Sequence, residues 1–195
     1  MLHIAGLDTA ERPRRDRKEA LPARPLGKLV RAVVRACGAP TARIMGERIV
    51  SALQAAAGDP ALVAPEQCRP HAECYARHVL YADPAGRFTV LALVWGAGQF
   101  SPSHAHQTWC AYAVRSGVLN ETLYAYDDAT GLVRPSCMAT RTAGYACFAE
   151  GGLDQIHRLG NAGGEPAISI HVYGVAQDRI ATHVNRIVEV APPEG

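Results

Sequence analysis

Three histidines have a spacing that suits a metal site: His104 and His106, which are one residue apart, and His157 further along the chain. In an extended strand, residues i and i+2 project to the same face, so His104 and His106 can hold one metal between them. His157 is far enough along to come from another strand. Three neutral imidazoles would leave positions open for a substrate and for oxygen. An HxH pair alone is equally compatible with two surface histidines that bind nothing.

A second group of polar residues has the periodicity of a strand. Ser169, His171 and Tyr173 fall at i, i+2 and i+4, so one strand can direct all three inward. The same pattern fits a tyrosine that merely buries its ring in a barrel core. Arg77 can hold a carboxylate with a fork of N–H donors that lysine lacks. An arginine on a strand is, however, more often an ordinary surface residue.

The elements that would position these residues are two helices followed by many short strands. Apolar residues recur at helical spacing over residues 26–57, with turn signals at Gly38-Ala39-Pro40 and Gly58-Asp59-Pro60. From residue 74 onward, short β-prone segments alternate with turn signals; they are 75–81, 88–95, 109–114, 120–126 and 168–173. This pattern indicates a β-sandwich or barrel. Residues 91–95 are apolar throughout, which is typical of a strand covered on both faces.

The composition fits one globular domain. The chain has 195 residues, of which 48% are hydrophobic and 19% are charged, so it needs neither a disulfide nor a metal merely to fold. We predict a mobile basic arm over residues 1–25, which are rich in arginine and proline. A single domain is predicted over residues 26–195, with helices in 26–57 and a barrel from about residue 70.

Charge and cysteine content argue against several classes of protein. The 20 lysines and arginines nearly balance 18 acidic residues, which argues against a nucleic-acid-binding protein. The six cysteines contain no CxxC pair, as a zinc ribbon or a thioredoxin-like motif would. No apolar run approaches the ~20 residues of a membrane span, and the N-terminal segment lacks the order of a signal peptide. We expect a cytoplasmic, soluble protein with reduced thiols and with neither nucleic acid nor a membrane as its partner.

The residues around the histidines resemble the two cupin motifs. The first motif is met by a glycine, the two histidines and a second glycine: Gly98, His104, His106 and Gly117. The second motif ends in a histidine, three residues and an asparagine: His157 and Asn161. Cys110 occupies the slot of the glutamate that usually completes the metal set. Among cupins, that replacement is characteristic of the thiol dioxygenases.

The resemblance to thiol dioxygenases of the cysteine dioxygenase family covers roughly residues 70–175. Trp95 lies in a segment similar to the strand that precedes the HxH pair in that family, and Ser169, His171 and Tyr173 match its Ser-x-His-x-Tyr triad. Arg77 lies in a segment similar to the one that carries the substrate-binding arginine. The resemblance implies a mainly β cupin fold, a double-stranded β-helix or jelly-roll barrel, with N-terminal α-helices.

The resemblance also implies a reaction and a role for each residue. The reaction inserts both atoms of O2 into a small thiol that carries a carboxylate, at one Fe(II) per chain. The implied iron ligands are His104, His106 and His157. The triad residues Ser169, His171 and Tyr173 would form a hydrogen-bonded relay, and Tyr75 and Arg77 would bind the substrate.

In the cysteine dioxygenase branch, a cysteine near the position of Cys110 becomes linked by a thioether bond to the ring of the triad tyrosine, here Tyr173. Cys110 stands four residues after His106, one fewer than in the mammalian enzymes. A shifted register would turn Cys110 to the opposite face of its strand.

The chain also resembles the bacterial 3-mercaptopropionate dioxygenases around Trp95 and Gln107-Thr108-Trp109. Those enzymes typically carry glutamine in place of Arg77 and glycine in place of Cys110. Both departures favour L-cysteine as the substrate and cysteine sulfinate as the product. 3-Mercaptopropionate and mercaptosuccinate remain alternatives, because an arginine accepts any of these carboxylates. The alternative from a different class is a non-catalytic cupin that senses a small molecule.

Overall fold

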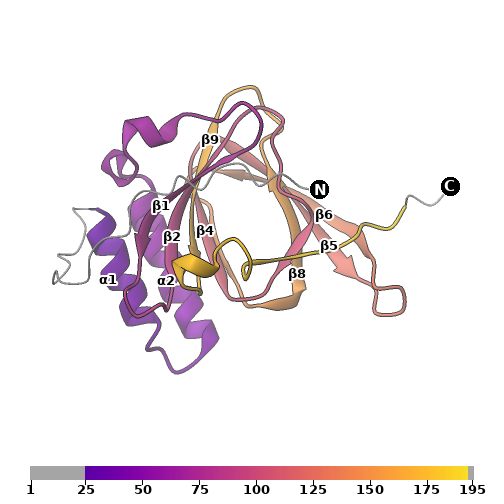
Figure 1. Ribbon diagram of the computed structural model, residues 1–195, viewed down its shortest axis with the longest axis horizontal. Helices are drawn as coiled ribbons and strands as arrows, with labels where there is room; N and C mark the ends of the chain where they lie inside the picture. Colours follow the sequence, from indigo (N-terminus) through magenta and orange to yellow (C-terminus); the bar gives the residue numbers. More distant parts are fainter. Residues whose placement is uncertain (1–24, 193–195) are drawn as a thin grey trace.

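The computed structural model describes residues 25–192, which form two α-helices followed by ten strands in two antiparallel sheets. The two sheets face each other as the halves of a jelly-roll barrel (Figure 1). The predicted mainly β class with N-terminal helices is therefore confirmed. The predicted basic arm lies outside the described residues, apart from Pro25.

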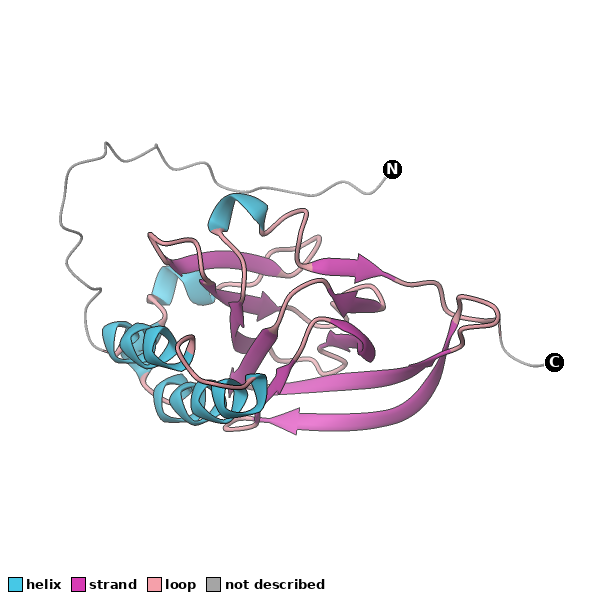
Figure 2. Cartoon of the chain, turned by 90° about the horizontal axis from the view of Figure 1, so that it is seen from below, coloured by secondary structure: helices cyan, strands magenta, loops and turns pink. Residues whose placement is uncertain are grey.

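The two helices form where the helical periodicity predicts them, as α1 (Leu26–Ala36) and α2 (Ala42–Ala57). In α1 the apolar residues Leu29, Val30 and Val33 are buried on one face. Helix α2 begins where the Thr41 hydroxyl accepts a hydrogen bond from the N–H of Ile44 (3.2 Å). Figures 1 and 2 show both helices on one side of the strands only, so they cover a single sheet.

The first sheet has the strand order β1-β2-β9-β4-β7. Its strands are β1 (Ala76–Ala82), β2 (Thr89–Trp95), β4 (Cys110–Ser116), β7 (Ala146–Ala149) and β9 (Ala167–Tyr173). Every residue of β2 and β9 is buried. Val90 and Ile170 belong to the apolar cluster that includes the helices, whereas Leu91 and Tyr173 belong to the cluster between the sheets. The prediction that the strand through residues 91–95 is covered on both faces is confirmed.

The second sheet has the strand order β10-β3-β8-β5-β6. Its strands are β3 (His104–His106), β5 (Val118–Tyr126), β6 (Val133–Thr142), β8 (Gly152–Gly160) and β10 (Asn185–Ile187). Strands β5 and β6 form a long hairpin that extends beyond the rest of the barrel (Figure 2). Between β4 and β5, Gly117 has a φ of 75°, and a Cβ at this position would lie 2.8 Å from the Cα of Ala167. The chain can turn from β4 into β5 at this position because the residue is glycine.

The predicted strand boundaries agree with the structure to within two residues, but β6, β7 and β10 were not predicted. Strand β6 is mostly exposed and contains Pro135, so it lacks the apolar alternation by which a strand is recognised. Strands β7 and β10 have four and three residues, too few to display a period. Short 3-10 helices, also unpredicted, span Pro60–Leu62, Pro65–Cys68 and Gln177–Arg179.

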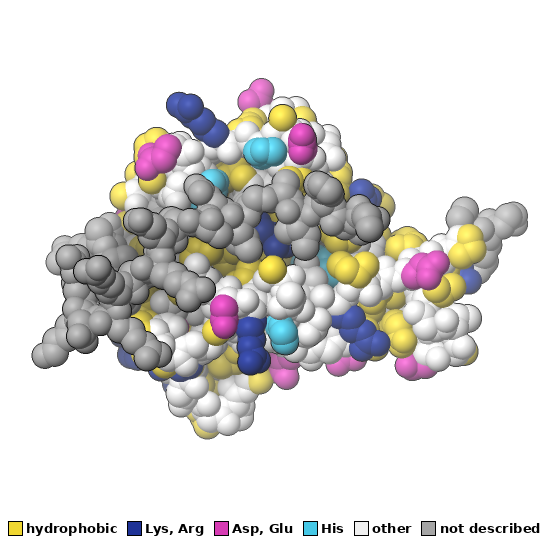
Figure 3. All heavy atoms as spheres, in the orientation of Figure 1, with side chains coloured by type: hydrophobic (Ala, Val, Ile, Leu, Met, Phe, Trp, Pro, Cys, Tyr) yellow, Lys and Arg dark blue, Asp and Glu magenta, His cyan; other side chains and the backbone are white. Residues whose placement is uncertain are grey.

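The outer surface of the described residues is mixed in character. On the face drawn in Figure 3, acidic and basic side chains lie in small groups among apolar ones, and neither sign of charge gathers over a single element. None of the helices in the described part of the chain is both long enough and apolar enough to cross a membrane.

Candidate metal centre

The three predicted histidines meet inside the barrel. His104 and His106 lie on the same face of β3, and His104 is paired directly with His157 on the neighbouring strand β8. The ring centroids are 4.7–5.1 Å apart, and one ligand nitrogen from each residue lies within 4.8 Å of the others. All three side chains are buried. One ion can therefore contact all three rings.

Hydrogen bonds orient two of the rings. The Nδ1 of His104 is 2.8 Å from the carbonyl oxygen of Pro102, and the Nδ1 of His157 is 2.7 Å from Oε1 of Glu121. Because both acceptors occupy the Nδ1 side, each ring keeps Nε2 as its free electron-pair donor. The Nδ1 of His106 is buried without a hydrogen-bond partner in the described structure.

Burial keeps His104 and His106 neutral. It is the main cause that lowers the pKa of His104 to about 3 and that of His106 to about 2, and the neighbouring His157 adds to both shifts. Neutral imidazoles offer the lone pairs that a metal needs. The convergent donors, the neutrality of His104 and His106, and the unpartnered ring nitrogen of His106 fit a divalent transition-metal ion.

The triad residues form one hydrogen-bonded chain that begins at Trp95. The indole Nε1–H donates to Ser169 Oγ (2.9 Å), and Ser169 Oγ lies 2.8 Å from Nε2 of His171. Indole nitrogen is only a donor, so the serine proton is left to donate to His171. The neutral His171 then carries its proton on Nδ1, 3.1 Å from the Tyr173 oxygen. The Tyr173 O–H is therefore free to donate to a third group.

Burial fixes the protonation states along this chain. It is the main cause that lowers the pKa of His171 well below 6.5, with His157 and Arg77 adding to the shift. It also raises the pKa of Tyr173 well above 10.0, so the phenol keeps its proton. His171 is stacked on Tyr112, with ring centroids 5.3 Å apart. The Tyr173 hydroxyl is thus a neutral, oriented donor near the histidines.

Arg77 and Tyr75 lie together at the exposed end of this group. Nη2 of Arg77 donates to the Tyr75 hydroxyl (3.1 Å), and the Tyr75 ring is stacked on Trp95 with centroids 4.4 Å apart. Arg77 is exposed, yet its charge acts on His104 and Tyr173. A guanidinium that is open to solvent and near the histidines can receive the anionic end of a ligand.

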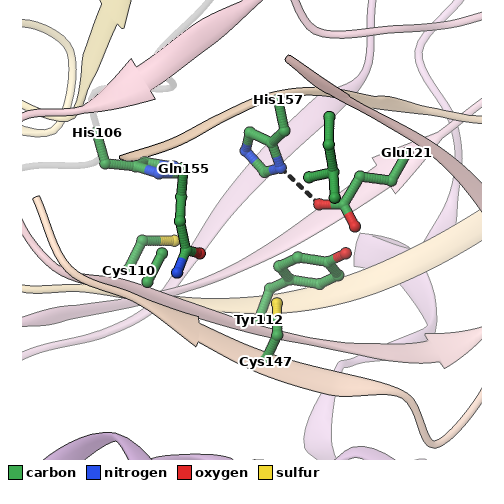
Figure 4. A pocket seen from close by; sticks show the side chains of 9 residues that line it. His106, Cys110, Tyr112, Glu121, Cys147, Gln155 and His157 are labelled. Atoms are coloured by element: carbon green, nitrogen blue, oxygen red, sulfur yellow. Dashed lines mark hydrogen bonds and ion pairs between the residues drawn. The ribbon is translucent and has the colours of Figure 1, made fainter. Parts of the chain in front are cut away.

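Cys110 lies on the inner face of β4. It is paired directly with Tyr173 on β9, and it lines a pocket together with His106 and His157 (Figure 4). Burial raises the pKa of its thiol well above the ordinary 9.0, so the thiol is protonated. Cys110 faces the site although it stands one residue nearer to His106 than in the mammalian enzymes. The segment between β3 and β4 is not a strand, so its length does not fix the face on which Cys110 lies.

Sequence reasoning missed Glu121, Tyr112 and Arg141. Glu121 on β5 receives hydrogen bonds from His157 and from Nε of Arg141 (2.8 Å). Burial alone would raise the pKa of Glu121, but these two donors outweigh it and lower the pKa. Alternation along β5 places Glu121 on the same face as Leu119, which was a detectable signal. The Tyr112 hydroxyl is buried without a hydrogen-bond partner among the described residues.

Two of the three cupin-motif residues outside the ligand set, Gly98 and Asn161, connect the two sheets. Gly98 has a φ of 71°, and its N–H donates to the carbonyl oxygen of Asn161 (2.9 Å). The Asn161 side-chain amide donates to the carbonyl oxygens of Trp95 (3.1 Å) and Glu165 (2.8 Å). These bonds tie the end of β8 to the end of β2, so they hold together the two sheets that carry the site.

Three buried histidines converge between the sheets of a jelly-roll barrel, an arrangement of the cupin class that can hold a metal ion. The family described as "Cysteine dioxygenase type I" matches residues 67–186, a range that contains every predicted site residue. This chain belongs to the cysteine dioxygenase type I family.

The chain is similar to mammalian cysteine dioxygenases. It is 28% identical to cysteine dioxygenase type 1 of Bos taurus over 113 residues, which cover 53% of this chain and 56% of the bovine protein. It is 30% identical to cysteine dioxygenase type 1 of Homo sapiens over 112 residues, which cover 52% of this chain and 55% of the human protein. The chain therefore spans about half the length of the curated relatives it matches.

Among solved structures, the chain is similar to an uncharacterized conserved protein with a double-stranded β-helix domain from Klebsiella pneumoniae. The TM-score is 0.48 at 22% identity, and the match covers 64% of this chain and 87% of that one. It is also similar to TT1209 from Thermus thermophilus, with a TM-score of 0.46 at 18% identity, over 58% of this chain and 97% of that one.

Proposed function

We propose that this chain is a non-haem Fe(II) thiol dioxygenase that converts the thiol of L-cysteine into the sulfinate. The reaction is R–SH + O2 → R–SO2H, in which sulfur supplies all the electrons and no other reductant is consumed. The observation that carries the proposal is the set of three buried, convergent histidines without a carboxylate ligand, in a member of the cysteine dioxygenase type I family.

His104, His106 and His157 would hold the iron. Fe(II) bound there would supply open coordination positions and the redox chemistry that joins a thiol to O2. Because three neutral ligands leave the ion its full positive charge, a thiol at this site is held as its thiolate. The proton that the thiol loses returns to solution or to the sulfinate product.

The chain's own residues would orient the substrate. Arg77 would pair with the carboxylate through its fork of N–H donors, and Tyr75 would hold the guanidinium in place. Tyr173 would donate its free O–H to the bound substrate, because His171 already occupies the lone pair of its oxygen. Ser169 and Trp95 would keep His171 in the tautomer that this requires.

L-Cysteine is the proposed thiol because its amino group can occupy a second position while Arg77 binds its carboxylate. The arginine at position 77 and the cysteine at position 110 both favour this substrate over 3-mercaptopropionate. Mercaptosuccinate and 3-mercaptopropionate share the carboxylate, so they are the comparison substrates.

The test is O2 consumption by the iron-loaded protein with a panel of thiols. We expect one O2 to be consumed per thiol, with mass spectrometry detecting cysteine sulfinate, and we expect cysteine to have the highest kcat/KM. A higher value for either comparison substrate would correct the substrate and leave the reaction class intact. A protein that binds these thiols but consumes no O2 with any of them would instead support the sensor alternative.

A covalent link between Cys110 and Tyr173 is expected to form during turnover. The two residues are direct cross-strand partners, so the thiol is held beside the phenol ring at a high effective concentration. Joining sulfur to a ring carbon removes one hydrogen from each residue. A separate O2 molecule, which is not incorporated into the product, accepts these two protons and two electrons and leaves as H2O2. Intact-mass analysis after extended turnover with iron and cysteine should show a loss of about two hydrogens.

Cys147 provides the matched control for this prediction. It is another largely buried thiol in the same pocket, and it is paired with Tyr112 instead of Tyr173. The variant Cys110→Ala should lose the mass change and keep slower activity, whereas Cys147→Ala should keep the mass change. A Cys110 that is wholly unlinked after many turnovers would make this residue only a buried thiol.

A further inference from the structure

We propose that Glu121 is a positioning residue for the metal centre, where it fixes the His157 ring with its proton on Nδ1 and its lone pair on Nε2. Arg141 holds the carboxylate in place and balances its charge. The proposal rests on the proposed metal site, and it adds a residue outside the ligand set that determines how tightly the metal is bound.

The contact between Glu121 and His157 is made between neighbouring strands of one sheet. His157 on β8 is paired with Leu123 on β5, and Glu121 lies two residues before Leu123 on the same face. The Glu121 side chain is only 4% exposed, and its Oε1 lies 2.7 Å from Nδ1 of His157. In Figure 4 the His157 ring and the Glu121 carboxylate point toward each other at one side of the pocket.

Arg141 determines the direction of this hydrogen bond. Its Nε donates to Oε2 of Glu121 at 2.8 Å, and its guanidinium lies over the Tyr145 ring, 4.1 Å from the centroid. Arginine is always charged and is only a donor, so the carboxylate it binds is an acceptor on both oxygens. Nδ1 of His157 must then be the donor in its bond to Oε1, and Nε2 is the nitrogen left for the metal.

The same pair explains how a carboxylate can lie so near the site without acting as a ligand. Glu121 and Arg141 together carry no net charge, so the ion would keep the charge that favours a thiolate. A glutamate in the ligand set would cancel part of that charge. In this arrangement the acid acts on the metal only through the orientation and basicity of the His157 ring.

The variant Glu121→Gln tests the proposal, because glutamine has the same shape with one acceptor oxygen and one donor amide. Two donors, from His157 and Arg141, would compete for that oxygen. If Arg141 takes it, the amide N–H faces Nδ1 and favours the proton on Nε2, at the metal position. Co(II) affinity, measured by competition with a chromophoric chelator in the absence of O2, should fall about 10–100-fold.

Asp83→Asn is the matched control. Asp83 is a buried carboxylate that forms an ion pair with Arg87 (2.6 Å) in the turn between β1 and β2. The Asp83→Asn variant should leave Co(II) affinity unchanged, although it also breaks a carboxylate–arginine pair. Thermal unfolding of both metal-free variants shows whether a change in affinity comes from a loss of fold.

NMR of the metal-free native protein with isotope-labelled histidine also tests the proposal. This measurement does not depend on whether a Glu121 variant folds. We expect the neutral form of His157 to carry its proton on Nδ1. The opposite tautomer, or unchanged Co(II) affinity in a folded Glu121→Gln protein, would overturn the proposal. A native protein that binds no Co(II), Zn(II) or Fe(II) would overturn the proposed metal centre itself, and this inference with it.

Discussion

Replacing His157 with alanine should remove almost all bound iron and almost all thiol oxidation. His157 is the only proposed ligand from β8, and without it two histidines on one short strand remain. Two neutral ligands cannot form the facial set that holds the ion in the barrel. Metal analysis of the native protein should give about one iron per chain, and the His157→Ala protein should contain little.

His104→Ala and His106→Ala should behave in the same way. His183 provides the control, because it is exposed and its Nδ1 is within hydrogen-bonding distance of the neighbouring Thr182. His183→Ala should retain both iron and activity. If the His157→Ala protein kept its iron and its activity, the three-histidine assignment would be wrong.

Replacing Arg77 with alanine should weaken kcat/KM for cysteine by roughly 2–4 kcal/mol, the magnitude of a lost charge-assisted pair. This loss corresponds to about 30- to 1,000-fold. The measurement is steady-state O2 consumption with cysteine and with cysteamine, which has no carboxylate. Cysteamine should be a poor substrate for the native protein, and its kcat/KM should not change in the variant.

The variant Arg77→Lys separates charge from geometry in this prediction. Lysine keeps the positive charge but loses the two-pronged donor geometry, so it should restore only part of the lost kcat/KM. Equal losses for cysteine and cysteamine in Arg77→Ala would show that the arginine acts through folding, since Arg77 also contacts Tyr75.

The parts of the site that could be predicted are those governed by spacing within one strand. The i, i+2 rule placed His104 and His106 on one face, and it placed Ser169, His171 and Tyr173 on one face. These relations depend only on the pleat of a strand. They hold wherever the strand lies in the barrel.

The parts that could not be predicted depend on which residue lies opposite which. Glu121 reaches His157 only because β5 pairs with β8 in one register. The register of β3 against β8 shifts between His104 and His106, and that of β4 against β9 shifts between Val114 and Ser116. Such irregularities change the count of residues between facing positions, so the sequence could not decide which face carried Cys110.

The two sheets carry different parts of the candidate site, so substitutions in one sheet can leave the other part unchanged. The three histidines proposed as metal ligands and Glu121 all come from the second sheet. The residues proposed to contact or orient the substrate come from the first sheet or from the residues that lead into it. Substitutions on the first sheet (β1-β2-β9-β4-β7) can therefore accumulate without replacing the proposed metal ligands. Under the proposed function, a new substrate preference therefore requires substitutions on the first sheet only.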